Sequence, residues 1–341
     1  MTTTDNSLHL DQVSTAVPRP RRMRLARKIA SVAGGTLAVF AIIAAAGAAY
    51  EQIAGSGDAA AYPPTGRLVD VGGHELHLDC RGQGTPTVVM DAGLGKSSLD
   101  WTLVQPELAH RTRVCTYDRA GMGRSAPGPE PRSPAHLADE LRVLLQNGGV
   151  TGPYVLVAHS LAGKNARMFA KTYPADVVGM VLVDARSEIV EATADHKSFA
   201  AALESQAAQY SIARRFGIAR LFGGGLVGQP LVPADMATQM VLAETNGDAI
   251  AATTQEGLAR TADDEALTSA NLGSMPLVVI AADESMSNMQ NWPEAQNAMA
   301  KLSSNGRLVV ANHSGHAVHL AAPNVVIDAV NDVLADVRNG L

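Results

Sequence analysis

From residue 66 onward the chain alternates between two hydrophobic patterns. Short, continuous apolar runs bounded by glycine or proline are typical of buried strands, whereas apolar residues that recur every three or four positions indicate amphipathic helices. Two short alternating runs around Gly72 and Gly73 predict a hairpin across residues 67–82. Further strands are expected at 87–93, 113–119, 154–160, 177–185, 276–282 and 307–313, and helices at 134–149, 161–174 and 325–337.

This alternation predicts an α/β fold, with a mostly parallel sheet of the eight-stranded type and helices on both faces. One segment breaks the alternation. Residues 186–272 show helical spacing without a strand pattern, and an insertion of this length between two strands usually is a functional cap. We therefore expect one α/β domain over residues 66–341 that carries a helical cap at 186–272.

The N-terminal region follows a different pattern, because residues 29–50 contain no charged side chain. A helix of this length measures about 33 Å, enough to cross about 30 Å of hydrocarbon, and it lacks the polar face of a core helix. Basic residues within 1–28 would stay in the cytoplasm and place the later residues on the other side of the membrane. The small residues Ala46 and Ala48 also fit a cleaved signal peptide. We expect a basic cytoplasmic tail at 1–28, a transmembrane anchor or signal sequence at 29–50, and a linker at 51–65.

The composition of the chain excludes several classes of protein. Of 341 residues, 46% are hydrophobic and 18% are charged, so the body can bury a core and is not intrinsically disordered. Residues 1–28 hold six of the 27 basic and two of the 33 acidic side chains, so the remaining chain is strongly acidic. An acidic body with 4% aromatic residues is unsuited to binding nucleic acid. Two cysteines exclude a disulfide-dense scaffold and a four-cysteine zinc site.

The segment VLVAHSLAGKNARMFA suggests a nucleophile, because a predicted strand runs directly into a predicted helix with Ser160 at the corner. Small residues two positions before and after it, Ala158 and Ala162, leave room for the sharp turn that exposes a nucleophilic serine. Alanine replaces the glycine of the usual G-x-S-x-G pattern at both positions. A serine that only caps the helix would fit the same segment.

A base and an oxyanion hole are also available in the sequence. His316 follows the last predicted strand, and the chain order of serine, acid and histidine matches that of the nucleophile-elbow hydrolases. His313, His319 and His159 are alternatives that we interpret as packing or strand-end residues. The backbone N–H groups of Leu161, directly after the serine, and of Leu94, in the glycine-rich loop after an early strand, are expected to form the oxyanion hole.

Together, these segments resemble the α/β-hydrolase superfamily, in particular its bacterial membrane-anchored or exported serine hydrolases of the esterase and lipase type. The resemblance is carried by GRLVDVGGHELHLDCRGQGTPTVVMDAGLG, RVCTYDRAGMGRS, GPYVLVAHSLAG, GMVLVDA, PLVVI and SGHAVHLAAP. It covers residues 66–185 and 275–335, and the cap between them has no counterpart. The run YDRAGMGRS is similar to a structural turn of the family.

The resemblance leaves the acid of the triad open. In most families of this fold the acid follows the seventh strand, which points to Asp283 or Glu284, whereas in a subset it ends the sixth strand, which points to Asp184. The resemblance also places Cys80 and Cys115 on neighbouring strands, where export would allow a disulfide. Two buried thiols are the alternative.

The function that the resemblance implies is hydrolysis of carboxylic esters through an acyl-enzyme, with no cofactor or metal. A peptidase, thioesterase or lactonase could use the same serine, and a non-catalytic binding module could retain the fold. Epoxide hydrolases and dehalogenases are disfavoured, because these relatives use an aspartate nucleophile. Aromatic and aliphatic residues in the cap favour a small hydrophobic ester as substrate. We expect a single-pass membrane protein with an extracytoplasmic catalytic domain, or a secreted one after signal cleavage; the sequence does not predict its oligomeric state.

Overall fold

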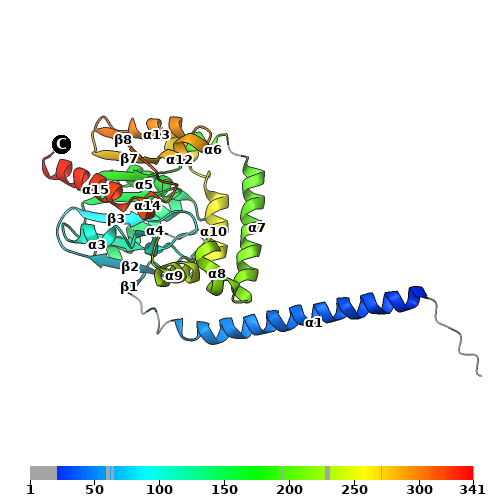
Figure 1. Ribbon diagram of the computed structural model, residues 1–341. Helices are drawn as coiled ribbons and strands as arrows, with labels where there is room; N and C mark the ends of the chain where they lie inside the picture. The colour runs from blue at the N-terminus through cyan, green and yellow to red at the C-terminus, as the bar shows by residue number, and fades with distance from the viewer. Residues whose placement is uncertain are drawn as a thin grey trace, which may run out of the picture.

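The computed structural model describes residues 21–58, 62, 65–193, 195–226, 231–269 and 271–340. An eight-stranded sheet with helices on both faces forms its centre (Figure 1), which confirms the predicted fold class. The strand order is β1-β2-β4-β3-β5-β6-β7-β8. The strands are β1 (Arg67–Asp70), β2 (Glu75–Arg81), β3 (Thr87–Asp91), β4 (Val114–Tyr117), β5 (Tyr154–His159), β6 (Val177–Val183), β7 (Leu277–Ala282) and β8 (Gly306–Ala311).

One strand, β2, runs opposite to all the others in the sheet. β1 and β2 form the predicted antiparallel hairpin, and β2 also pairs antiparallel with β4. The strands from β4 to β8 are parallel, so their carboxyl ends lie along one edge of the sheet. Every residue of β3, β5 and β7 is buried, because helices cover both faces, and this explains why these strands read as continuous apolar runs.

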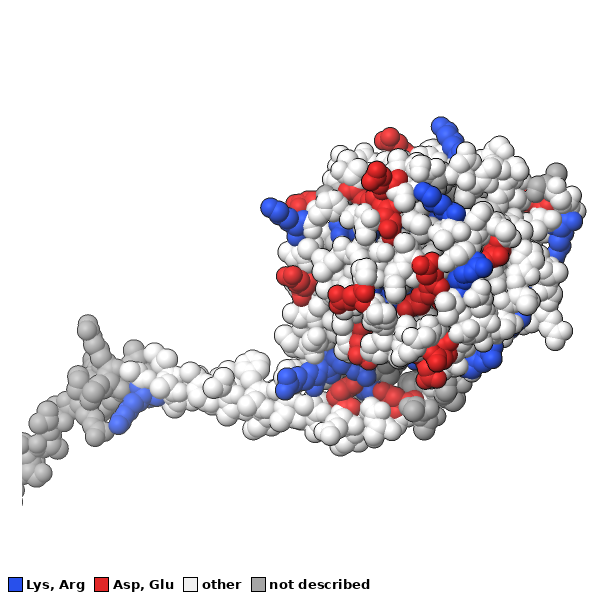
Figure 2. All heavy atoms as spheres, turned by 180° about the vertical axis from the view of Figure 1, so that it is seen from behind, with Lys and Arg blue, Asp and Glu red and all other residues white. Residues whose placement is uncertain are grey.

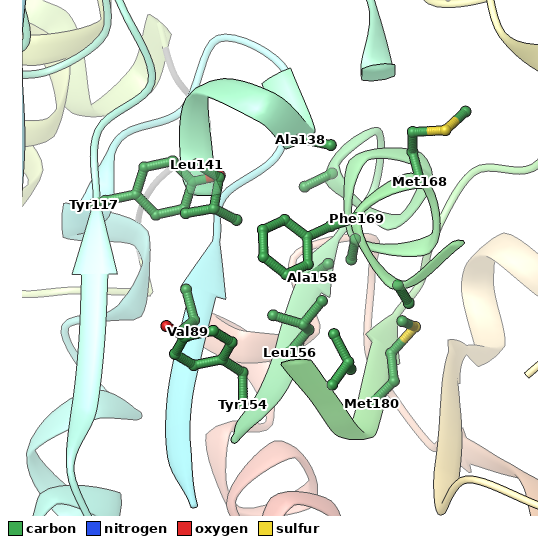
Figure 3. Close-up of a cluster of buried hydrophobic side chains, with 14 of the residues drawn as sticks. Val89, Tyr117, Ala138, Leu141, Tyr154, Leu156, Ala158, Met168, Phe169 and Met180 are labelled. Carbon is green, nitrogen blue, oxygen red and sulfur yellow. The ribbon is translucent and has the colours of Figure 1, made fainter. Parts of the chain in front are cut away.

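Helices on the two faces bury two separate apolar cores. In one core Phe169 of α5 lies among Leu141 of α4, Leu156 and Ala158 of β5, and Met180 of β6 (Figure 3). This packing fixes α5 against β5, the strand that leads into it. The flanking helices are α3 (Gln105–Ala109), α4 (Pro134–Asn147), α5 (Ala162–Thr172), α12 (Asp283–Asn288), α13 (Trp292–Ala300), α14 (Val318–Ala321) and α15 (Pro323–Arg338), with short 3-10 turns at Ser98–Trp101 and Pro174–Asp176.

The segment predicted as a cap forms helices between β6 and β7 and no strand in its described residues. These helices are α6 (Glu188–Glu191), α7 (His196–Arg215), α8 (Ile218–Leu226), α9 (Ala234–Glu244), α10 (Gly247–Ala259) and α11 (Asp264–Thr268). A buried ion pair ties the cap to the body: Arg119, after β4, donates to both carboxylate oxygens of Glu256 on α10 at 2.9 and 2.8 Å. Burial of either charge without its partner would destabilise the folded state, so the ion pair holds α10 against the sheet.

The N-terminal helix α1 (Arg21–Gly55) projects from the body (Figure 1). Among the described residues it is the one helix long and apolar enough to cross a membrane, over Ala26–Gly55, and its apolar stretch is unburied. It is longer than the predicted span of 29–50, because the helix begins at Arg21 and continues through the first residues of the expected linker up to Gly55. Residues 1–20 of the predicted tail and 59–61, 63 and 64 of the linker lie outside the described residues.

Candidate active site

Ser160 occupies the corner between β5 and α5 and has a positive φ of 54°. Few residues other than glycine adopt this conformation, and it persists only where the surrounding structure enforces it. The enforcement comes from close packing, since Ala158 and Ala162 on either side of the serine are almost completely buried. Alanine therefore fits where glycine is usual, and the side chain of Ser160 is presented at the carboxyl edge of the sheet.

The predicted nucleophile, base and one of the predicted acids form a chain of hydrogen bonds. Ser160 Oγ lies 2.9 Å from His316 Nε2, and His316 Nδ1 lies 2.6 Å from Asp184 Oδ2. With the Nδ1 proton donated to the carboxylate, Nε2 is free to accept the proton of the serine hydroxyl. The imidazole is partly exposed, whereas the carboxylate is fully buried.

Asp184 follows β6 and is held by three further donors. Its Oδ1 accepts the Ala282 N–H at 3.0 Å and the indole N–H of Trp292 at 2.8 Å, and its Oδ2 accepts the Ser285 hydroxyl at 2.6 Å. Trp292 is fully buried. Trp292 and Ser285 were not predicted as site residues, because they lie about a hundred residues from Asp184 along the chain and belong to no motif.

The structure brings Asp184, and not Asp283 or Glu284, to the imidazole. The carboxylate of Asp283 accepts the backbone N–H groups of His313 and Ser314 at 2.7 and 2.9 Å. These hydrogen bonds lower the pKa of Asp283 below its ordinary value. Asp283 is the first residue of α12, and its side chain is hydrogen-bonded to the loop after β8 and not to His316. Glu284 is exposed.

The loop expected to complete an oxyanion hole lies against the serine. A methyl group added at Gly93 would lie 3.3 Å from Ser160 Cβ and 2.9 Å from His159 Nδ1, so this close approach requires glycine. Within the described part of the chain, neither the Leu94 N–H nor the Leu161 N–H donates a hydrogen bond. Two free backbone donors beside a serine suit a developing oxyanion.

Arg119 holds this loop in place and was not singled out from the sequence. Its guanidinium donates to the carbonyl oxygens of Ala92 and Gly93 at 2.5 and 2.8 Å and to Asp91 at 2.5 Å. Arg119 belongs to the run YDRAGMGRS, which was interpreted as a structural turn. The turn therefore also positions the loop that carries Leu94.

Buried histidines support the loop of His316. His159 Nε2 donates to the His316 carbonyl oxygen at 3.0 Å, and His319 donates to Asp100 at 3.2 Å. Burial, and then repulsion from the neighbouring His319 and His316, hold the pKa of His159 well below its usual range. It therefore remains neutral and structural, as predicted for a packing residue. Potential metal-ligand atoms of Asp100, His159 and His319 lie within 4.8 Å of one another. The two hydrogen bonds engage one polar atom of each side chain, whereas Asp100 Oδ1, His159 Nδ1 and His319 Nδ1 have no partner among the described residues.

A pocket lies between the loop that carries Leu94 and the helices of the cap. It is lined by apolar and polar side chains from the loop and from α7, α9 and α10: Leu94, Lys96, Leu203, Gln206, Tyr210, Glu244, Ile250 and Thr253 among them. Lys96 and Glu244 form an ion pair at 2.6 Å in its wall. Burial raises the pKa of Glu244 to about 7 although Lys96 opposes the shift. The pocket is thus less uniformly apolar than the sequence suggested.

A disulfide joins Cys80 of β2 and Cys115 of β4, which lie opposite each other in the antiparallel pair. Their Cα atoms are 4.0 Å apart. The bond ties the N-terminal hairpin to the parallel part of the sheet, away from the serine.

The chain is similar in sequence to known proteins. Over 239 residues the chain is 30% identical to the uncharacterized protein C23C11.06c of Schizosaccharomyces pombe, and over 260 residues it is 25% identical to the uncharacterized protein YqjL of Bacillus subtilis. These matches cover 64% and 74% of the chain. The chain spans 40% of the yeast protein, 85% of YqjL, and 18% of a relative from Hormonema carpetanum that shares a 129-residue stretch.

Solved structures share the fold. A thermophilic esterase from Thermogutta terrifontis superposes with a TM-score of 0.61 at 24% identity, over 80% of this chain and 99% of that one. The family model described as "Alpha/beta hydrolase family" matches residues 88–329, a range that contains the serine, the histidine and the aspartate. The chain therefore belongs to the alpha/beta hydrolase family.

Proposed function

We propose that the protein is a serine hydrolase that cleaves carboxylic esters through an acyl-enzyme intermediate. The observation that carries this proposal is the hydrogen-bond chain from Ser160 through His316 to Asp184, with the serine in a strained turn. A serine that merely capped α5 would not need a positive φ, and the N-cap residue of α5 is Leu161 and not Ser160.

In the first half of the reaction, Ser160 Oγ attacks the ester carbonyl carbon while its proton moves to His316 Nε2. The carbonyl oxygen becomes an oxyanion that the N–H groups of Leu94 and Leu161 receive. When the carbon–oxygen bond to the alcohol breaks, the imidazolium returns the proton to the leaving alkoxide. An alcohol departs, and the acyl group remains on Ser160.

In the second half, His316 removes a proton from water, and the resulting hydroxide attacks the acyl carbon. Collapse of this intermediate breaks the bond to Ser160 Oγ, which regains its proton from the imidazolium, and the carboxylic acid is released. Asp184 holds the Nδ1 proton and stabilises the positive charge on the imidazolium in both halves. Its other hydrogen bonds keep the carboxylate oriented.

We further propose that the ester is small. The pocket beside Leu94 offers Leu203 and Ile250 for an apolar group, and Gln206, Tyr210 and the Lys96–Glu244 pair for a polar one. This lining supports esters with a short apolar group next to a polar substituent over long aliphatic chains. The esterase among the structural neighbours is consistent with the reaction class.

We also propose that α1 anchors the protein in the cell membrane, with the catalytic domain outside the cytoplasm. Its uncharged, unburied stretch and the basic residues before it support this orientation. Residues 1–28 would form the cytoplasmic tail, and the hydrolase domain with its cap would extend from residue 66 to residue 341.

A fluorophosphonate probe tests the nucleophile, because it reacts with activated serines irrespective of the natural substrate. We expect the probe to label Ser160 in the wild-type protein and to leave Ser160→Ala unlabelled. Ser314→Ala serves as the control, since Ser314 is a buried serine of the same edge that has no hydrogen bond to His316 side-chain atoms. Parallel assays with p-nitrophenyl esters, thioesters, lactones and peptides then separate the possible reactions. An unreactive Ser160 in a folded protein would favour the non-catalytic binding module.

A further inference from the structure

The C-terminal end of α1 packs against the cap. A methyl group added at Gly47 would overlap the carbonyl of Phe216, in the turn between α7 and α8. Arg214 donates to Glu51 at 3.0 Å, and Arg220 pairs with Glu51 at 3.1 Å and with Asp58 at 2.7 Å. Figure 2 shows acidic and basic side chains side by side where the uncharged helix meets the body. The end of α7 and the start of α8 are thus held beside α1.

Exposed apolar side chains concentrate at the same place. Outside α1, the described residues include eight large apolar side chains that are exposed, and four of them fall between positions 212 and 222. We refer to Ile212, Ile218, Leu221 and Phe222 as the cap tip; they are 56%, 41%, 59% and 67% exposed. The last three have the spacing of one helix face. Phe222 is more exposed than any other large apolar residue of the body, which is unusual for a surface that meets only water.

We propose that the cap tip is a membrane-docking surface that inserts its apolar side chains into the bilayer crossed by α1. The position of Gly47 supports the bilayer as the binding partner of the cap tip. If residues 29–50 span the hydrocarbon, Gly47 lies about 5 Å, three residues, inside its outer boundary. The turn that packs on Gly47 is therefore at the depth where amphipathic helices bury an apolar face. The exposed Arg215 next to this turn suits lipid phosphates.

Docking would fix the orientation of the hydrolase domain on the membrane. α7 connects the cap tip at one end with Leu203 and Tyr210, which line the pocket. The side of the cap that covers the pocket would consequently face lipid. This inference depends on α1 remaining in the membrane and does not depend on which bond the enzyme cleaves.

The experiment uses the full chain in phosphatidylcholine–phosphatidylglycerol liposomes, with an environment-sensitive fluorophore on one introduced cysteine. The native cysteines do not compete, because they are joined in a disulfide. Phe222→Cys reports on the cap tip, and Val310→Cys, 42% exposed on the edge strand β8, is the matched control. We expect blue-shifted emission at position 222 that is quenched by acyl-chain nitroxides and protected from iodide. Position 310 should show the opposite behaviour.

A second pair of variants tests whether α1 holds the tip in place. Added to Phe222→Cys, Gly47→Leu should abolish the lipid signal, because the side chain separates α1 from the turn. Gly34→Leu in the same helix should preserve it, since nothing lies within 4 Å of Gly34. Unchanged thermal unfolding identifies variants that still fold. An aqueous signal at position 222, a lipid signal that survives Gly47→Leu, or a mature chain that begins after residue 50 would each overturn the proposal.

Discussion

Asp184 and Asp283 end neighbouring parallel strands, β6 and β7, yet they have different surroundings. Asp184 is fully buried, has a positive φ of 41°, and directs its carboxylate at the imidazole of His316. Asp283 is less buried and binds two backbone N–H groups of the loop that carries His316. One aspartate therefore contacts the proposed base, and the other holds the loop behind it.

The comparison teaches that a strand-end aspartate acquires its role from its neighbours more than from its position in the chain. Asp184 has four donors around it, and two of them, Trp292 and Ser285, come from the segment that follows β7. The residues after β7 thus contribute to the site by orienting Asp184 instead of supplying the acid.

The largest expected effect separates the two aspartates directly. Asp184→Asn should lower kcat by about 10⁴, the loss known when the acid of a serine protease triad becomes an amide, because the imidazole then favours the wrong tautomer. Asp283→Asn should change kcat only slightly, since the side chain does not contact His316 and its amide oxygen can still accept one of the two loop N–H groups. Turnover of a p-nitrophenyl ester at matched protein stability measures both. Equal losses in the two variants would contradict the assignment of Asp184.

A smaller loss is expected when the indole hydrogen bond is removed. Trp292→Phe removes one of the two donors to Asp184 Oδ1 and leaves the Ala282 N–H as the other. A hydrogen bond to a charged group contributes about 1.5–3 kcal/mol, which corresponds to roughly 10–100-fold in rate if all of it appears in the transition state. Trp101→Phe is the matched control, because within the described structure the indole N–H of this buried tryptophan has no partner. The pH profile of kcat should change only for Trp292→Phe. If both variants lose activity equally, packing explains the effect.

Removal of the Ser285 hydroxyl should lower kcat less than removal of the Trp292 indole N–H. In Ser285→Ala, Asp184 Oδ2 loses one neutral donor at 2.6 Å but retains His316, so we expect a decrease in kcat of about tenfold or less. Ser287→Ala provides the comparison, because its hydroxyl donates to the backbone carbonyl of Asp283. A larger loss for Ser287→Ala would argue that α12 as a whole, and not the hydrogen bond, supports the site.

The smallest effect concerns stability and its dependence on pH. The folded state lowers the pKa of Asp283 from 3.8, so its carboxylate stabilises the fold above that value and loses this contribution as the pH falls through the lower, folded pKa. We expect Asp283→Asn to lower the Tm slightly at pH 7 and to match the wild type once both side chains are neutral in acid. A Tm difference that stays constant down to the lowest pH at which the protein folds would contradict this assignment.

Several features could be predicted from the sequence because they depend on local patterns. The buried strands, the hairpin at Gly72 and Gly73, and the helical segment between β6 and β7 follow from hydrophobic spacing. Ser160 and His316 were proposed from a strand–turn–helix motif and from chain order. The structure places their side chains within hydrogen-bond distance.

Other features depend on contacts between distant segments. The choice between Asp184 and Asp283 rests on Trp292 and on backbone geometry, neither of which leaves a pattern near the aspartates. Arg119 holds the loop of Leu94 because β3 and β4 are neighbours in the sheet, and this pairing leaves no pattern near Arg119 in the sequence. The extension of α1 to Gly55 likewise accompanies ion pairs between Glu51 and the cap.

The central claim is that the acyl group of the substrate is transferred to Ser160, and mass spectrometry of a rapidly quenched reaction tests it most directly. With a short p-nitrophenyl ester, we expect a mass increase equal to one acyl group on the peptide that contains Ser160, formed as fast as the first equivalent of p-nitrophenol is released. Ser160→Ala should show neither. Steady hydrolysis by Ser160→Ala at the wild-type rate, or an acyl group on another residue, would contradict the account.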